Sequence, residues 1–85
     1  MPAKHFVIPE KVSKKSHKLP LRIKKHLALV LLNLMENPLL GTKLQGELED
    51  YYKIRLGDYR LIYYFNSKKS IVVVVKIEHR QGVYR

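Results

Sequence analysis

Apolar residues recur every three to four positions in the first half of the chain, which is the spacing of an amphipathic helix. The stripe expected to be buried consists of Ile23, Leu27, Val30, Leu31 and Leu34, widened by Ala28, Leu32 and Met35. Pro20 suits the first position of this helix because its missing N–H is not needed there. Asn37 ends the helix because the residue before Pro38 disfavours helical backbone angles. We therefore expect a long helix between Pro20 and Asn37.

Two shorter elements precede this helix. Residues 3–8 end in an apolar run closed by Pro9, which predicts a first strand near the edge of a sheet. Residues 10–18 are basic and offer only Val12 and Leu19 as apolar anchors. This second segment is expected to form a short helix with a cationic exposed surface.

After a loop at residues 39–46 the period of the apolar residues changes to two, which is typical of half-buried strands. We expect strands at residues 51–56, 59–65 and 70–79. Gly57 and Asp58 predict a tight hairpin of type II′ between the first two, and residues 66–69 predict a second turn. The pattern predicts one α+β domain over residues 1–85, an antiparallel sheet of about four strands with two N-terminal helices packed on one face, joined by the first strand.

The composition narrows the class of protein. Lys and Arg number 17 against 7 Asp and Glu, a formal net charge of +10, and such a field attracts polyanions. A merely soluble basic surface is the alternative, but the charge is segregated: residues 1–26 hold eight basic residues and one acidic residue. The absence of cysteine excludes disulfides and thiolate metal sites. No apolar run approaches the ~20 residues that cross a bilayer, and Pro9 interrupts any leader-like segment, so we expect a soluble cytoplasmic protein without membrane contact.

Strand alternation gathers cations on one face of the predicted sheet, because successive side chains point to opposite sides. We expect Ile54, Leu61 and Val73 to face the helices. The cations then expected on the other face are Lys53, Arg55, Arg60, Lys76 and Arg80. Because a solvated face normally mixes both signs of charge, this set favours a binding surface.

Aromatic rings fall on the same predicted face. Strand alternation places Tyr51 and Tyr64 on the same side of the sheet as the cations. Only Glu78 on this face is opposite in charge to the cations. Phosphates can meet the cations while bases stack on the rings, so the pattern favours single-stranded nucleic acid. An ordinary solvated sheet face is the alternative for any one of these residues.

Metal and cofactor chemistry is not expected. The histidines have no metal-ligand spacing: His5, His17, His26 and His79. No glycine-rich phosphate loop occurs, and the acidic cluster at Glu47, Glu49 and Asp50 is explained by a solvated loop. Chemistry on a phosphodiester would therefore use cations to stabilise the phosphorane and a lysine, histidine or carboxylate as the base.

Three motifs carry a family resemblance that covers nearly the whole chain. They are K-L-x-G at residues 43–46, Y-x-I-R-x-G-D-Y-R-L-x-Y at residues 52–63 and H-R-x-x-V-Y at residues 79–84. The chain resembles the RelE branch of the RelE/ParE toxins of toxin–antitoxin systems. The resemblance implies a ribosome-dependent endoribonuclease that enters the vacant decoding site and cuts the messenger there. ParE relatives instead poison DNA gyrase, and the ending of this chain is similar to the RelE side.

The resemblance implies catalytic roles position by position. Lys53 matches the first catalytic lysine of the family, and Arg55 matches the second basic position. Arg60 matches the arginine that holds the scissile phosphate. Arg80 matches the arginine that stabilises the transition state or protonates the leaving oxygen, and Tyr84 matches the tyrosine that orients or stacks on the substrate. Cleavage would be attack by the messenger's own 2′-hydroxyl, leaving a cyclic phosphate without a metal.

Two departures from the family pattern affect these roles. Arg55 stands where well-studied members have lysine, and a guanidinium keeps its proton, so it is a poor base. Lys53 is therefore the first choice for the base, since the like charges around it favour its neutral form. His79 is the rival, although its parity, like that of Tyr63, places it on the core side. The second departure is that no C-terminal helix is expected after Tyr84.

The expected partners follow from the charge and the resemblance. A cognate acidic, RelB-like antitoxin should wrap the toxin, which we expect to be monomeric within a hetero-oligomer. The other expected partners are messenger RNA and the 30S decoding site, with RNA contacts at Lys11, Lys14, Lys15, Lys18 and Lys76. The alternatives are a non-enzymatic gyrase inhibitor of the ParE kind, or a decayed relative that binds RNA and antitoxin without cutting.

Overall fold

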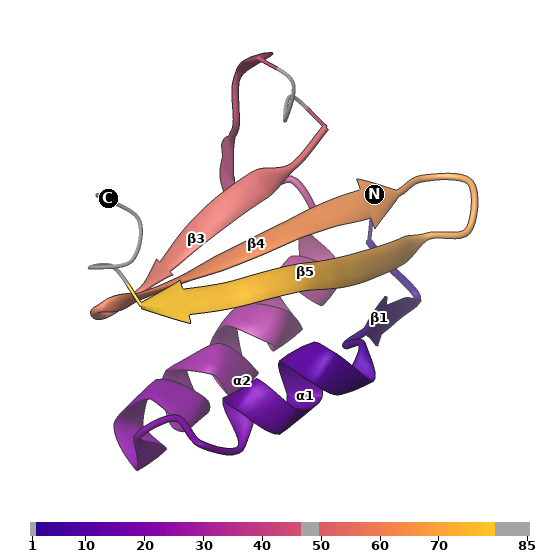
Figure 1. Ribbon diagram of the computed structural model, residues 1–85. Coiled ribbons are helices and arrows are strands. Elements are labelled where there is room, and N and C mark those ends of the chain that lie inside the picture. The colour runs from indigo at the N-terminus through magenta and orange to yellow at the C-terminus, as the bar shows by residue number, and fades with distance from the viewer. Residues whose placement is uncertain (1, 47–49, 80–85) are drawn as a thin grey trace.

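The computed structural model describes residues 2–46 and 50–79 and contains two helices on one face of a five-stranded sheet (Figure 1). The elements in chain order are β1 (His5–Val7), α1 (Glu10–Ser16), α2 (Leu21–Glu36), β2 (Thr42–Lys43), β3 (Tyr52–Leu56), β4 (Tyr59–Asn66) and β5 (Ile71–His79). The strand order is β1-β5-β4-β3-β2. The predicted α+β class and the position of both helices on one face are confirmed.

The sheet differs from the prediction at its two edges. β1 lies at an edge, as expected, and pairs with β5 in parallel, with His5 opposite Ile71, whereas every other pair is antiparallel. β2 is an additional strand within the predicted loop at residues 39–46. Its two residues, Thr42 and Lys43, are too few to produce a period in the sequence.

Helix α2 supplies most of the helical part of the core. The five residues of its predicted central stripe are all buried: Ile23, Leu27, Val30, Leu31 and Leu34. Pro20 is the N-cap and Leu21 the first residue of α2, so the helix begins one position later than expected. Met35 packs partly buried against the core. The expected burial of Ala28 and Leu32 is wrong, because both are exposed on the helix surface turned away from the sheet. No helix in the described part of the chain is long and apolar enough to cross a membrane.

Helix α1 is shorter than predicted. It ends at Ser16 rather than at Lys18, and the Ser16 hydroxyl donates a hydrogen bond of 2.7 Å to the carbonyl of Ser13 in its last turn. Val12 and Leu19 are both buried, so the two apolar anchors were predicted correctly. The basic surface of α1 therefore points outward while one side holds the helix to the core.

Two turns and a bulge set the register of β3, β4 and β5. Gly57 has a φ of 61° and Asp58 has no positive φ, which fits the expected type II′ hairpin. Ile62 pairs with Lys76 but Tyr63 pairs with Val74, so Val75 is an extra residue in β5. This bulge reverses the expected orientation of Val73.

The helix-facing side of β5 consists of Val72 and Val74 before the bulge and Ile77 after it, all nearly inaccessible. The expectation that Val73 faces the helices is therefore wrong. Lys76 lies after the bulge and keeps the outward orientation that parity predicted. A period of two cannot choose between the faces where the sequence contains consecutive valines.

Candidate nucleic-acid interface

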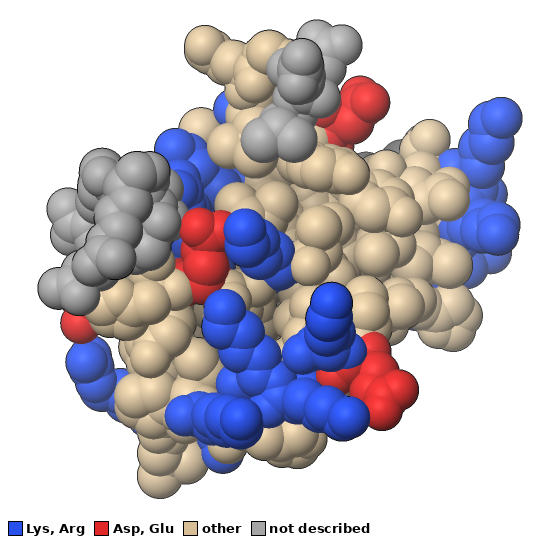
Figure 2. Space-filling view, viewed as in Figure 1, with Lys and Arg blue, Asp and Glu red and all other residues tan. Residues whose placement is uncertain are grey.

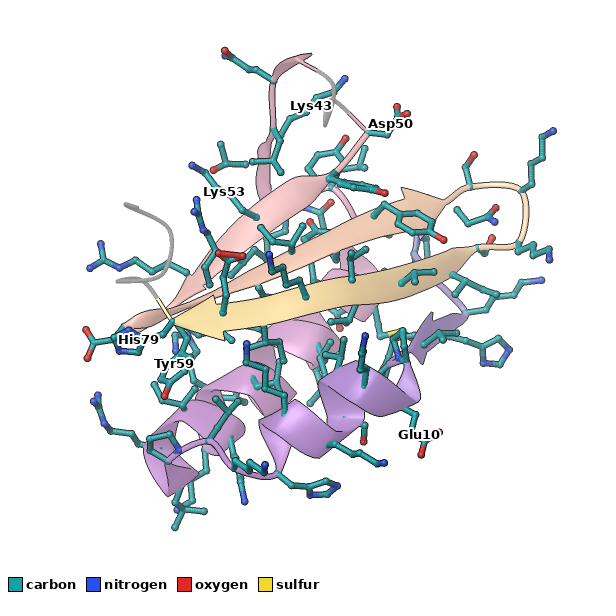
Figure 3. All side chains as sticks on the ribbon, in the orientation of Figure 1. Glu10, Lys43, Asp50, Lys53, Tyr59 and His79 are labelled. Carbon is teal, nitrogen blue, oxygen red and sulfur yellow. The ribbon has the colours of Figure 1, made fainter. Side chains whose placement is uncertain are left out.

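The side of the sheet that the helices leave uncovered, called the outer face here, carries the candidate residues. Its described members are Tyr51, Lys53, Arg55, Arg60, Ile62, Tyr64, Val73, Lys76 and Glu78. Strand pairing arranges them in three rows across β3, β4 and β5. Figure 3 shows Lys53 on the side of β3 away from the helices, while Tyr59 and His79 lie toward α2.

The middle row contains two lysines separated by an apolar residue. Lys53 is opposite Ile62, and Ile62 is opposite Lys76. The two lysines are two strand spacings apart, about 10 Å. Their flexible side chains can therefore approach one phosphodiester from both sides, with Lys53 half-buried beside Ile62.

The row nearest the β3–β4 turn contains two arginines and a glutamate. Arg55 is directly opposite Arg60, a like-charge pairing that is unfavourable without partners. The Arg55 Nε donates a hydrogen bond of 3.2 Å to the carbonyl of Gly57, which directs this guanidinium to the turn. Arg60 lies opposite Glu78 on its other side. The two arginines therefore occupy different surroundings, with Arg60 toward the centre of the face.

Glu78 lowers the positive charge of the outer face from within. Its Oε1 lies 3.2 Å from the Lys76 Nζ, and its side chain is only 19% exposed against 61% for Lys76. The described part of this face carries four cations and one carboxylate, as parity predicted. The ion pair itself was not predicted, although residues i and i+2 of a strand share a face.

The third row is aromatic. The rings of Tyr51 and Tyr64 stack with centroids 5.8 Å apart and planes inclined by 27°. Both side chains are half-buried, and Tyr64 pairs across the sheet with Val73. Parity placed both tyrosines on this face, but their contact depends on the strand register.

His79 lies on the opposite side of the sheet from Lys53. It pairs with Tyr59 at the start of β4, and the two rings meet edge to face with centroids 4.9 Å apart. The core-side position expected from parity is confirmed, although the His79 residue is exposed rather than buried.

A packed loop fixes the backbone under Lys53. The Gly41 N–H donates a hydrogen bond of 2.9 Å to the hydroxyl of Tyr63, which is buried and stacks on Tyr52 with centroids 5.5 Å apart. Burial raises the pKa of the Tyr63 phenol, so it stays neutral and accepts this bond. A Cβ on Gly41 would lie 2.8 Å from the Lys53 carbonyl oxygen, so only glycine fits without displacing β3.

The predicted RNA-binding lysines are divided between two surfaces. Lys11, Lys14 and Lys15 are exposed on α1, and Lys18 is exposed just beyond it. Lys14 forms an exposed ion pair of 3.4 Å with Glu10. Figure 2 shows Lys and Arg side chains gathered over the helices, beside β3 and at the β4–β5 turn. Lys76 belongs to the outer face instead.

Two predicted catalytic residues, Arg80 and Tyr84, lie outside the described residues. Within residues 2–46 and 50–79, no group of three or more histidine, aspartate or glutamate side chains is placed to hold a metal ion. Among the predicted catalytic residues, the described site therefore consists of Lys53, Arg55 and Arg60.

Known proteins resemble this chain over most of its length. Residues 8–84 match the family described as the ParE toxin of the type II toxin-antitoxin system parDE. Toxin RelG of Mycobacterium tuberculosis is 38% identical over 74 residues, covering 81% of this chain and 82% of the relative.

Solved structures share the fold at a lower sequence identity. The crystal structure of the RelBE2 toxin-antitoxin complex from M. tuberculosis has a chain with a TM-score of 0.80 and 29% identity, covering 94% of this chain and 100% of that one. The isolated RelE toxin of E. coli gives a TM-score of 0.81 and 30% identity, covering 91% and 84%. The family match, the 38% identical relative and the shared fold thus define a toxin of the type II toxin–antitoxin class. The chain belongs to the RelE/ParE superfamily as a RelE-like toxin, which confirms the resemblance seen in its motifs.

Proposed function

We propose that this toxin is an endoribonuclease that cuts messenger RNA in the ribosomal decoding site. The observation that carries the proposal is the outer face, where Lys53, Arg60 and Lys76 surround Ile62 on a surface that the helices leave open. The RelE-like family membership supports the same activity. Cations next to stacked rings match the phosphates and bases of a single strand.

The proposed reaction is an internal transesterification. The 2′-hydroxyl oxygen attacks the adjacent phosphorus, and the bond from phosphorus to the 5′ oxygen of the next nucleotide breaks. The products are a 2′,3′-cyclic phosphate and a 5′-hydroxyl, so atoms balance without water, metal or cofactor. One proton leaves the 2′-hydroxyl for a base, and one reaches the departing 5′ oxygen. The protein must also stabilise the negative charge of the phosphorane.

We assign the base to Lys53 and the binding of the phosphate to Arg60. Lys53 lies in the middle row of the outer face, and its backbone is fixed by the close approach of Gly41. Arg55 would contribute positive charge from a position beside the β3–β4 turn, since its Nε donates a hydrogen bond to the carbonyl of Gly57. His79 is a weaker candidate for the base because it lies on the helix side against Tyr59. Arg80, outside the described residues, would stabilise the transition state or protonate the leaving oxygen.

Tyr84 would complete the site by orienting or stacking on the substrate. The exposed lysines of α1, together with Lys18, would contact ribosomal RNA, while Lys76 would contact the messenger. Because the proposed substrate is messenger RNA bound to the ribosome, we place the protein in the cytoplasm.

An acidic antitoxin is the proposed protein partner. Related RelE chains are found in complexes with RelB antitoxins in M. tuberculosis and Pyrococcus horikoshii. The +10 charge of this chain favours an acidic partner, and we propose that the toxin is monomeric within a toxin–antitoxin hetero-oligomer. Purification from the native operon should yield an acidic protein that co-elutes with the toxin, and a toxin recovered alone would contradict this partner.

The second candidate function is inhibition of DNA gyrase. It is favoured by the match to a family described by its ParE member. Three reactions separate the candidates: purified full-length protein with stalled ribosomes carrying a messenger, with the same messenger free in solution, and with gyrase and relaxed plasmid. We expect cuts in the decoding-site codon of the ribosome-bound messenger alone. Loss of supercoiling without any RNA cut would establish gyrase inhibition instead, and efficient cutting of free RNA would contradict ribosome dependence.

A further inference from the structure

We propose that the Tyr51–Tyr64 pair is a subsite for one base of single-stranded RNA, adjacent to the phosphate held between Lys53 and Lys76. The inference rests on the proposed function, because it extends the same RNA-binding face by about one nucleotide. It assigns a role to two side chains that the reaction itself does not use.

The position of the pair along the strand supports this role. Tyr51 precedes Lys53 by two residues on the same side, which separates them by about 7 Å along an extended backbone. Tyr64 is likewise two residues beyond Ile62, the apolar centre of the lysine row. A base next to a phosphate bound at Lys53 would therefore meet aromatic rings, whereas the opposite direction leads to the Arg55–Arg60 row.

One side of Tyr64 opens on a cavity of about 690 Å³ at the far end of β3 and β4. Its lining includes three rings, two ammonium groups and one carboxylate, from Tyr52, Tyr64, Phe65, Lys43, Lys68 and Asp50. Figure 3 shows Lys43 of β2 and Asp50, which lies just before β3, at this end of β3. A volume of this size lies within the range of small-molecule sites and accommodates a nucleobase.

The chemistry of the lining favours a nucleotide. An aromatic face stacks with any base, and stacking tolerates every sequence because all bases have a π-face. Among the described residues of the lining, Lys43 and Lys68 outnumber the carboxylate of Asp50, so a neighbouring phosphate is favoured there. A purely structural role, in which the two rings cover the sheet and nothing else, is the competing explanation that the test must separate.

The test compares two substitutions of Tyr64 that separate the effect of the aromatic ring from that of apolar packing. Tyr64→Phe keeps the aromatic face, whereas Tyr64→Leu keeps apolar contact with the sheet and removes the face. Tyr59→Leu is the matched control, because it makes the same change on the same strand but on the helix side. Thermal melting of each variant shows that it is folded.

The assay measures the Kd for ribosomes programmed with a messenger carrying a 2′-deoxy nucleotide at the attacking position, which blocks cutting. A second set of messengers lacks one base at a time on either side of the cut. We expect Tyr64→Leu to bind the intact messenger about 5- to 140-fold more weakly than the parent, the range of one base stack. The penalty should vanish for one particular abasic messenger, and Tyr64→Phe and Tyr59→Leu should bind like the parent.

Two results would overturn the subsite: equal binding by Tyr64→Leu and the parent, or a penalty that persists with every abasic messenger. A parent protein that fails to bind ribosomes programmed with either the intact or the abasic messengers would overturn the subsite as well. Failure of the proposed function gives a different result, since a parent that binds the ribosome but leaves an unmodified messenger intact refutes cleavage and not base binding.

Discussion

Replacing Glu78 with glutamine is expected to strengthen the binding of single-stranded RNA to the outer face. Glu78 is the only carboxylate among the described residues of that face, and it holds the Lys76 ammonium at 3.2 Å. Glutamine has the same shape and no charge, so the variant frees Lys76 for a phosphate. It also leaves Arg60, which is directly opposite Glu78, without a neutralising neighbour.

The magnitude follows from counterion release. The described outer face has four cations and one carboxylate, so its net charge changes from +3 to +4, and the freed Lys76 can neutralise one more phosphate. Each phosphate neutralised on a single strand steepens the plot of log affinity against log salt concentration by about 0.7. Glu78→Gln should therefore bind more tightly at low salt, with a slope steeper by about 0.7, and lose the advantage as salt rises.

The measurement is fluorescence anisotropy of a short, labelled single-stranded RNA over a salt series. Glu10→Gln is the matched control, because it changes the net charge of the protein by the same amount and frees Lys14 on α1 from an ion pair of 3.4 Å. We expect the control to leave the slope for this short RNA unchanged. Equal slopes for Glu78→Gln and the parent, or the same increase in both variants, would refute the placement of RNA on the outer face.

Replacing the four lysines of the α1 region with glutamine should weaken ribosome binding. The slope of log affinity against log salt concentration should become shallower by about 0.7 to 0.9 for each phosphate that the variant no longer neutralises. An unchanged slope in a salt titration would contradict docking of this region on ribosomal RNA. The four are Lys11, Lys14, Lys15 and Lys18. Arg80→Ala should lower the single-turnover cleavage rate about 100- to 1000-fold with binding retained, and Tyr84→Phe should cut while Tyr84→Ala does not; normal cutting by both alanine variants would contradict these roles. Tyr63→Phe removes the acceptor of the Gly41 N–H and should lower stability by about 1 to 3 kcal/mol, measured by denaturant unfolding, and no loss would show that the bond is dispensable. Burial raises the pKa of Tyr63 above its ordinary value of 10.0, so the unfolded chain releases the phenol proton at a lower pH than the folded chain. The titration of Tyr63 should therefore leave stability unchanged below pH 10 and lower it as the pH rises further, and Tyr63→Phe should lack this pH-dependent loss.

The fold was predictable wherever the apolar residues of a whole segment followed a single period. The helical period identified the buried side of α2, and the strand period together with the glycine turn identified β3 and β4. The exposed apolar residues of α2 could not be separated from its core in the same way, because Leu32 is as apolar as Leu31. The bulge at Val75 was hidden by the run of valines, since every register of that run is equally apolar.

The candidate site was predictable in its faces and not in its contacts. Alternation alone placed Lys53, Arg55 and Arg60 together, and it separated His79 from them. The bond from Arg55 to Gly57, the Lys76–Glu78 pair and the cavity beside Tyr64 depend on rotamers and loop paths. Rotamers and loop paths do not produce a periodic pattern in the sequence, so these features could not be predicted from it.

The central claim is that the outer face promotes attack by the messenger's own 2′-hydroxyl. The most direct measurement uses stalled ribosomes with two messengers that differ only in the hydroxyl at the mapped cut, ribose in one and 2′-deoxyribose in the other. We expect the ribose messenger to be cut once, giving a 2′,3′-cyclic phosphate and a 5′-hydroxyl, and the 2′-deoxy messenger to stay intact at that position. Cutting of both messengers at the same position would contradict this mechanism, because another nucleophile would then be responsible.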